Sequence, residues 1–210
     1  LVSEISNYGH DVRFQKMNAL DEGLRADVIK DLKSLGIVKC FIHSLAFGTL
    51  KPMISSDGNN LDSKNINMTL NVMSNSLIYW AQDLYHHNLF INGSQIISMT
   101  SSGGRRQWPS YGAVSMSKAA LESATRQLAI ELVKDGIAAN AIQAGVTNTP
   151  ALRKIPGYSE MIDFSIKKNP SGRLTKVEDI ADIVSMISLS NSSWMTGNII
   201  RVDGGEDIAG

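Results

Sequence analysis

A tyrosine and a lysine seven residues apart are the two side chains whose types and spacing could do chemistry together. Tyr111 and Lys118 lie within residues 94–132, where an apolar run is followed by small polar residues and then by a long helical pattern. Seven residues make two helical turns, so the phenol and the ammonium share one face if the helix already includes Tyr111. A phenol has a reference pKa of ~10, stays protonated at neutral pH and can therefore donate a proton.

The elements around this pair predict where it lies in the fold. Strands are predicted over residues 12–17, 37–42, 95–99, 138–143 and 198–202. Helices are predicted from an Asp21 cap to Leu35 and over residues 63–87, 110–134, 158–168 and 177–189. This alternation indicates an α/β fold, a doubly wound parallel sheet of three layers in one Rossmann-type domain over residues 1–210. Such folds bind ligands at the carboxyl edge of the sheet, where residues 95–118 place the pair.

The opening residues suggest that part of this fold is missing from the sequence. Residues 1–9 resemble the end of a helix closed by a glycine, and the first residue is Leu1. No Gly-x-Gly-x-x-Gly or Gly-x-x-x-Gly-x-Gly motif follows any predicted strand. We therefore expect that the first strand, Gly-rich phosphate turn and helix, roughly 30 or more residues, precede the sequence given.

Composition excludes several other classes of function. Lys+Arg and Asp+Glu balance at 20 each, so no basic field indicates a nucleic acid or an anionic membrane as partner. The single cysteine, Cys40, excludes an internal disulfide, and the four histidines lack the spacing of metal ligands. No apolar run approaches the ~20 residues that span a bilayer, and no signal-peptide pattern is present. We expect a cytoplasmic protein without a metal.

Four stretches, spread in order along the chain, carry a family likeness. They are residues 41–47, 111–118, 143–149 and 200–205. Together they resemble the short-chain dehydrogenase/reductases, and within them the enoyl-acyl-carrier-protein reductases. The six residues between Tyr111 and Lys118 match the spacing of enoyl reductases, whereas ordinary family members have three. Val114 stands where those members have their catalytic tyrosine, and valine cannot donate a proton.

The resemblance implies conjugate reduction of an enoyl thioester by NADH or NADPH. Hydride goes to C3, and Tyr111 donates to the enolate oxygen while Lys118 holds the nicotinamide ribose. Ser101 matches the catalytic serine of ordinary members, although many enoyl reductases carry a second tyrosine there; a polar turn residue is the alternative. Asn71 matches a helix asparagine that holds a water near the lysine, or it is polar packing.

The resemblance also implies contacts to the cofactor. Asn18 and Ala19 match the adenine contact, although Asp-Val is usual there. Ser44, Leu45 and Ala46 match the turn beside the ribose and nicotinamide, and Val146 and Thr147 would offer backbone groups to the carboxamide. Thr149 would reach the pyrophosphate. The other expected cofactor-binding positions are Met99, Ala144 and Gly145. Arg105, Arg106 and Trp108 would meet a phosphopantetheine arm or carrier surface, or form a solvated basic loop. Asp203 is expected to be structural.

The implied partners are an enoyl thioester on acyl carrier protein or coenzyme A, and a second copy of the chain in a homodimer or homotetramer. Two other functions stay open. One is a carbonyl reductase, such as a 3-ketoacyl reductase, that uses Tyr111 with Ser101. The other is a non-catalytic binding protein, which the absent phosphate loop favours. Alone, a tyrosine at a helix start is usually a packing residue and a helical lysine is usually solvated, but the other motifs favour catalysis.

Overall fold

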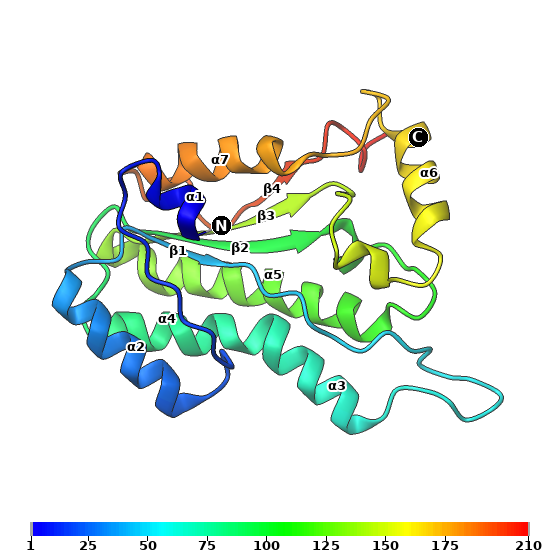
Figure 1. Cartoon of the computed structure of the whole chain (residues 1–210), viewed down its shortest axis with the longest axis horizontal. Coiled ribbons are helices and arrows are strands. Elements are labelled where there is room, and N and C mark those ends of the chain that lie inside the picture. Colours follow the sequence, from blue (N-terminus) through cyan, green and yellow to red (C-terminus); the bar gives the residue numbers. More distant parts are fainter. Residues whose placement is uncertain (1, 210) are drawn as a thin grey trace.

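Four parallel strands form the sheet at the centre of the structure, with helices on both of its faces (Figure 1). The computed structural model describes residues 2–209. The strands are β1 (Cys40–His43), β2 (Gln95–Ser101), β3 (Ala138–Ala144) and β4 (Ile199–Val202). They lie side by side in chain order, and every neighbouring pair is parallel. Their carboxyl ends therefore meet at one edge of the sheet.

The helices account for most of the remaining chain. They are α1 (Val2–Ser6), α2 (Glu22–Leu35), α3 (Ser63–Leu70), α4 (Ser76–His86), α5 (Gly112–Leu132), α6 (Tyr158–Lys168) and α7 (Val177–Leu189). A π-helical turn, η1 (Asn71–Asn75), joins α3 to α4. Shorter 3-10 turns are η2 (Ser102–Gly104), η3 (Val133–Asp135) and η4 (Leu152–Lys154). In Figure 1, α6 lies at the end of the sheet toward which the strand arrows point, beside the carboxyl terminus.

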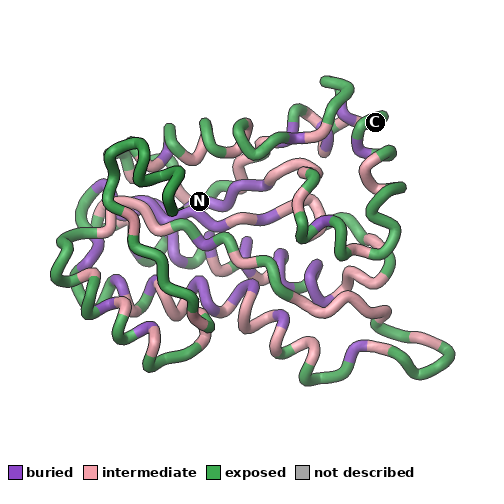
Figure 2. The backbone as a smooth tube through the Cα atoms, viewed as in Figure 1, coloured by how far each residue is buried: buried purple, intermediate pink, exposed green. Residues whose placement is uncertain are grey.

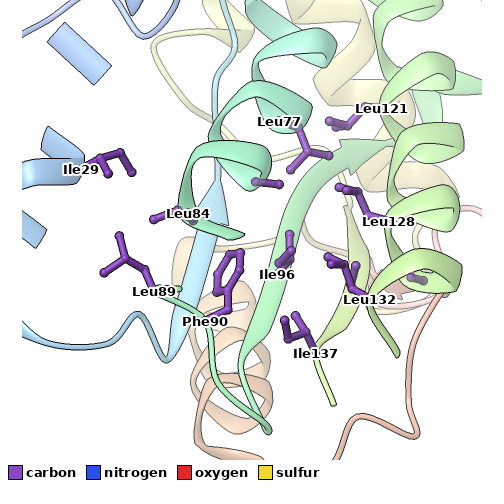
Figure 3. Packing of buried hydrophobic residues seen from close by; sticks show 13 residues of the cluster. Ile29, Leu77, Leu84, Leu89, Phe90, Ile96, Leu121, Leu128, Leu132 and Ile137 are labelled. Carbon is purple, nitrogen blue, oxygen red and sulfur yellow. The ribbon is translucent and has the colours of Figure 1, made fainter. Parts of the chain in front are cut away.

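Helices α2, α4 and α5 cover one face of the sheet through a core of apolar side chains. Ile96 of β2 packs with Leu77 of α4 and with Leu121 and Leu128 of α5, and Ile29 of α2 closes the cluster (Figure 3). All of these side chains are buried. Such contacts, and not helix propensity, supply most of the stability of helices in a folded protein.

Helix α7 covers the opposite face. Ile97 and Ile142 pack there against Ile187, with Ile183 of the same helix alongside. Consecutive strand residues point to opposite faces, so Ile96 and Ile97 serve different layers. The predicted α/β fold with three layers is confirmed.

Local sequence signals set several helix boundaries where they were predicted. The Asp21 carboxylate accepts a hydrogen bond from the Leu24 N–H at 3.0 Å and caps α2, and Gly36, with φ +124°, ends it. Helices α6 and α7 match the predicted ranges. The single helix predicted over residues 63–87 differs because η1 interrupts its regular pattern.

The strand predicted over residues 12–17 is wrong. These residues form irregular chain and pair with no strand among residues 2–209. An alternating pattern favours a strand only if a neighbour supplies the ladder of hydrogen bonds. Here β1 is the edge of the sheet and pairs only with β2. Figure 2 shows the chain before α2 as mostly exposed, and Phe14 is among the exposed apolar residues.

Truncating the central core side chain Leu77, which is 0% exposed, should strongly destabilise the protein. We expect Leu77→Ala to lower the free energy of unfolding by about 3 kcal/mol, because it removes buried contacts and leaves a cavity. Leu35→Ala, at a position 52% exposed, is the control and should cost less than about 1 kcal/mol. Urea unfolding followed by circular dichroism measures both, and equal losses would contradict the assigned core.

Candidate active site

Polar contacts between β2 and α5 position the predicted catalytic side chains. Helix α5 returns alongside β2, so residues further along the helix meet earlier residues of the strand (Figure 1). The Thr100 hydroxyl donates to Glu122 Oε1 at 2.7 Å, and Ser98 Oγ lies 2.8 Å from Thr125 Oγ1. Buried polar groups are costly when unpaired, so these contacts fix the register of the helix on the strand.

Tyr111 lies directly before α5, as its N-cap residue, beside the end of β2. The Ser101 side chain hydrogen-bonds to the phenol. Burial raises the pKa of Tyr111 above its ordinary value, and the bond from Ser101 offsets only part of this effect. A Cβ on Gly103 would lie 2.7 Å from Tyr111 Cε1, so the turn after β2 needs glycine there. The phenol is thus held as a neutral donor beside a hydroxyl.

A tight turn delivers the chain to Tyr111. The Tyr111 N–H donates to the Trp108 carbonyl at 3.1 Å, and between them Ser110 has a φ of 61°. Pro109 followed by a left-handed residue fits a type II turn. The Trp108 indole N–H donates to the Pro156 carbonyl at 3.0 Å. The turn is therefore attached to the segment that leads into α6.

Lys118 lies two turns further along α5 and is buried. Its Nζ donates to the Met99 carbonyl at 2.6 Å. Burial lowers the pKa of Lys118 to about 8, although the nearby Glu122 opposes this shift. An ammonium has three donors, so one bond to Met99 leaves capacity for a ligand.

Val114 occupies an apolar position of α5 against the loop after β1. It is buried, and Gly48 of the loop after β1 lies against it. A Cβ on Gly48 would lie 2.6 Å from Thr69 Cγ2, 3.1 Å from Val114 Cγ2 and 3.3 Å from Met73 Sδ. A side chain at position 48 would therefore crowd Val114, and the loop after β1 needs glycine there.

Asn71 begins the π-helical turn, and its Oδ1 accepts from Asn75 Nδ2 at 2.8 Å. Among residues 2–209, Asn71 makes no hydrogen bond to Tyr111 or Lys118, so its water-holding role stays a prediction. The turn packs against α5. Ser76, the first residue of α4, links this turn to β1, because its hydroxyl donates to the Val72 carbonyl at 2.7 Å and lies 2.7 Å from His43 Nε2.

His43 was not among the predicted site residues. The Ser76 hydroxyl donates its proton to the Val72 carbonyl, so it can only accept from His43 Nε2. The ring proton of the neutral His43 therefore lies on Nε2, and Nδ1 is a hydrogen-bond acceptor. Burial and the charge of Lys118 lower the pKa of His43 to about 4, so the ring is neutral. Among the polar side-chain atoms buried within residues 2–209, His43 Nδ1 is the one without a hydrogen-bond partner.

The predicted cofactor residues near the beginning of the chain lie in turns. Asn18 Oδ1 accepts from the Leu20 N–H at 3.1 Å, and the Ala19 carbonyl accepts from Trp80 Nε1 at 3.0 Å. Residues 44–46 follow β1 directly, with Ser44 exposed. The pairing of β1 with β2 ends at His43 opposite Ser98, directly before residues 44–46, whose contacts to the cofactor stay a prediction.

The turn after β3 uses several of its own polar groups. The Thr147 hydroxyl donates to the Gly145 carbonyl at 3.0 Å, and Thr149 Oγ1 accepts from the Leu152 N–H at 3.2 Å. A Cβ on Gly145 would lie 3.0 Å from Asp203 Cα, so only glycine allows this approach. Ala144 ends β3. Because Thr149 Oγ1 only accepts in this contact, its hydroxyl proton is available for another acceptor.

Both backbone groups of Val146 are engaged by the protein itself. Its carbonyl accepts from the Thr175 N–H at 3.1 Å, and its N–H donates to Glu206 Oε2 at 3.1 Å. The second Glu206 oxygen accepts from the Ser165 hydroxyl of α6 at 3.3 Å. Sequence reasoning missed Glu206, because nothing local marks an acidic residue whose partner lies 60 positions earlier.

Arg105 and Arg106 lie in an exposed loop, as in the solvated interpretation, and both pair with one carboxylate. Both arginines pair with Asp207, whose side chain is 3% exposed, and Arg201 Nε contacts the same carboxylate at 3.1 Å. Burial acts to raise the pKa of Asp207, but hydrogen bonds from Gln143, Arg105 and Arg106 lower it to about 2. This carboxylate ties the loop between β2 and α5 to the carboxyl-terminal turn.

The carboxyl edge fits a nicotinamide dinucleotide in two respects. Lys118 has ammonium N–H donors that its bond to the Met99 carbonyl leaves unused. His43, whose buried Nδ1 has no hydrogen-bond partner, directly precedes the turn of residues 44–46. Among residues 2–209, no three His, Cys, Asp or Glu side chains gather as metal ligands would. Over the same residues, no helix combines the length and apolar character needed to cross a bilayer.

Comparisons with known proteins agree with this geometry. A family model described as enoyl-(acyl carrier protein) reductase matches residues 2–206. The NADH-dependent enoyl-[acyl-carrier-protein] reductase FabI of Aquifex aeolicus is 29% identical, and the alignment covers 100% of this chain and 77% of that protein. Its crystal structure has a TM-score of 0.86 at 26% identity, covering 100% of this chain and 81% of that one. FabI of Candidatus Liberibacter asiaticus has a TM-score of 0.87 at 26% identity, covering 99% and 80%.

The family model spans the whole described sheet and includes Tyr111, Val114 and Lys118. The chain belongs to the enoyl-(acyl-carrier-protein) reductase family of the short-chain dehydrogenase/reductases.

Proposed function

We propose that this protein reduces the 2,3 double bond of enoyl thioesters in fatty-acid synthesis, with NADH or NADPH as reductant. The observation that carries this proposal is the placement of the buried phenol. Tyr111 meets Ser101, whereas Val114, one turn later, is enclosed by Gly48. The offset of three residues is about 4.5 Å along a helix axis. It suits a conjugated substrate whose oxygen lies further from the reacting carbon than a simple carbonyl oxygen does.

The side chains divide the chemistry between them. When bound, the reduced nicotinamide supplies hydride to C3 of the substrate. Tyr111 donates to the enolate oxygen, and its raised pKa keeps the phenol protonated before the reaction. Lys118, held by the Met99 carbonyl, binds the ribose hydroxyls and adds positive charge near the enolate. Residues 44–46 and 144–149 line the same edge and complete the binding surface for the cofactor.

The substrate would approach over the turn at Trp108 and over α6. The substrate that we propose is a thioester on acyl carrier protein or coenzyme A, whose long arm would extend past this turn to Tyr111. Such chemistry belongs in the cytoplasm, where we place the protein.

A 3-ketoacyl reductase is the second candidate. It is favoured by Ser101, which stands where many enoyl reductases carry a second tyrosine and which hydrogen-bonds to Tyr111. Against it stands Val114, because the proton donor of ordinary carbonyl reductases lies at that position.

Tyr111→Phe should abolish most enoyl reduction while cofactor affinity stays nearly unchanged, because only the proton donor is removed. With a 2-enoyl thioester and NADH or NADPH, we expect kcat to fall roughly 100-fold or more. Tyr85→Phe removes a hydroxyl bonded to Asp135, away from the site, and serves as control. Near-normal turnover by Tyr111→Phe would refute the role of Tyr111. Faster reduction of a 3-ketoacyl thioester by the wild type would select the second candidate.

Lys118→Ala should weaken the binding of the cofactor as well as slow the reaction. The variant loses the ammonium that is held at this edge by the Met99 carbonyl. We expect the Kd for NADH or NADPH to rise roughly tenfold, as for one lost charge-assisted hydrogen bond. Titration by fluorescence measures it, with Lys30→Ala, an exposed lysine of α2, as control. An unchanged Kd would exclude the ribose role.

We also propose that the protein assembles into homodimers or homotetramers. Leu121, Leu128 and Leu132 of α5 lie in the core of the chain itself, so they do not support assembly. The outward apolar side chains of α5 are Met116 and Ile130, and Ile130 is 72% exposed. A second copy packed on this face would bury them.

Light scattering at micromolar concentration should therefore give the mass of a dimer or tetramer. Ile130→Glu should shift the protein toward the monomer, because it introduces like charges across the contact. Ile54→Glu, on an exposed loop, should leave the mass unchanged. A monomeric wild type would contradict assembly.

A further inference from the structure

A second buried charge lies one turn after Lys118 on α5. Glu122 is 5% exposed and Lys118 is 7% exposed. Residues four apart on a helix lie on the same face, one above the other. Successive residues of β2 hold the two side chains. Lys118 Nζ donates to the Met99 carbonyl at 2.6 Å, and the Thr100 hydroxyl donates to Glu122 Oε1 at 2.7 Å.

The turn η2 packs against both side chains. A Cβ on Gly104 would lie 3.0 Å from Glu122 Oε1 and 3.4 Å from Lys118 Cβ. The backbone of the turn therefore covers the carboxylate and the stem of the lysine together. Charges that are buried in this way are screened much less by water and salt than charges on the surface.

The carboxylate acts on the ammonium through its charge, because its own hydrogen bond goes to Thr100. Burial lowers the pKa of Lys118 to about 8, and the charge of Glu122 opposes this shift. Without Glu122, burial would act with less opposition, and the ammonium would lose its proton at a lower pH.

The other titratable groups near Lys118 do not supply a negative charge. Tyr111 is a neutral phenol, and His43 of β1 is neutral because its pKa is lowered to about 4. Within the described chain, β2, β3, η1 and η2 pack against α5 and contain no titratable side chain.

The remaining titratable side chains of α5 and of the helical elements packed against it are engaged elsewhere or exposed. Asp83 of α4 pairs with Arg25, which also lies over the Tyr79 ring, and Asp135 of η3 accepts from the Tyr85 hydroxyl. The exposed ones are Lys64, His86, Arg126, Glu131 and Lys134.

We propose that Glu122 is a positioning residue that keeps Lys118 charged and so able to hold the nicotinamide ribose. The proposal rests on the proposed function, in which Lys118 binds the ribose hydroxyls. A purely structural role, in which Glu122 only fixes α5 on β2 through Thr100, would affect stability without changing how cofactor binding depends on pH.

The pH dependence of cofactor binding to the intact gene product tests this role. Fluorescence titration with NADH and with NADPH gives each Kd without any turnover. For the wild type we expect the Kd to stay constant up to about pH 8 and to rise above it, because an uncharged amine makes a weaker hydrogen bond to the ribose. Lys118→Ala should abolish this rise, which assigns it to the lysine.

Glu122→Gln keeps the shape of the side chain and its capacity to accept from Thr100, but removes the charge. We expect the rise in Kd to begin roughly one pH unit or more below its wild-type onset. The double variant Thr100→Val with Glu122→Met replaces both partners of the hydrogen bond by apolar groups, and should lower the onset in the same way. It provides a second neutral variant if the first does not fold.

Two controls separate charge from structure. Thr100→Val removes the hydrogen bond and keeps the carboxylate, so it should reduce thermal stability without lowering the onset. Glu131→Gln removes an exposed glutamate of the same helix and should retain the wild-type onset. Thermal unfolding of each variant checks folding separately.

The same onset in the wild type and in a folded neutral variant would overturn the role of Glu122 and leave the reductase function intact. A wild-type Kd that stays constant up to about pH 10, near the ordinary pKa of lysine, would overturn it as well. Failure of the wild type to bind either cofactor at any pH would overturn the proposed function and this inference with it.

Discussion

The burial of the Lys118 ammonium against the Met99 carbonyl is the interaction on which the site depends. A charged amine tolerates such a position only when donors and acceptors are supplied by neighbours that cannot move away. The register of α5 on β2, fixed by Thr100 with Glu122 and by Ser98 with Thr125, provides that rigidity. The same register brings the residue before α5 to the end of the strand, where Ser101 meets the phenol.

Local sequence patterns predicted the parts of the structure that local physics decides. The cap at Asp21, the ranges of α6 and α7, and the strands β2 and β3 follow from periodicity and turn residues within a few positions. The prediction of a strand over residues 12–17 was wrong because a strand forms only beside a neighbouring strand, and a local pattern does not show whether such a neighbour exists. Tyr111 and Lys118 could be singled out because they lie on one helix, two turns apart.

Two carboxylates that the sequence patterns did not identify make their contacts with residues far away in the chain. Asp207 bonds to Arg105 and Arg106, about 100 positions earlier, and Glu206 bonds to Val146 across 60. Neither carboxylate belongs to a spacing pattern, so each was visible only after folding. Both lie in the turn after β4, which approaches the carboxyl edge of the sheet. The last residues of the chain thereby hold the loop before Tyr111 on one side and the turn after β3 on the other.

The apolar enclosure of Val114 bears on how one scaffold supports different reductions. Gly48 packs against Val114 so closely that a side chain at position 48 would press on Thr69, Val114 and Met73. The loop after β1 and the start of α5 are therefore in direct contact at Val114. We expect these two segments to vary together in reductases of different chemistry. The position of the phenol is thus a property of the packing between two segments, and not of one residue in a motif.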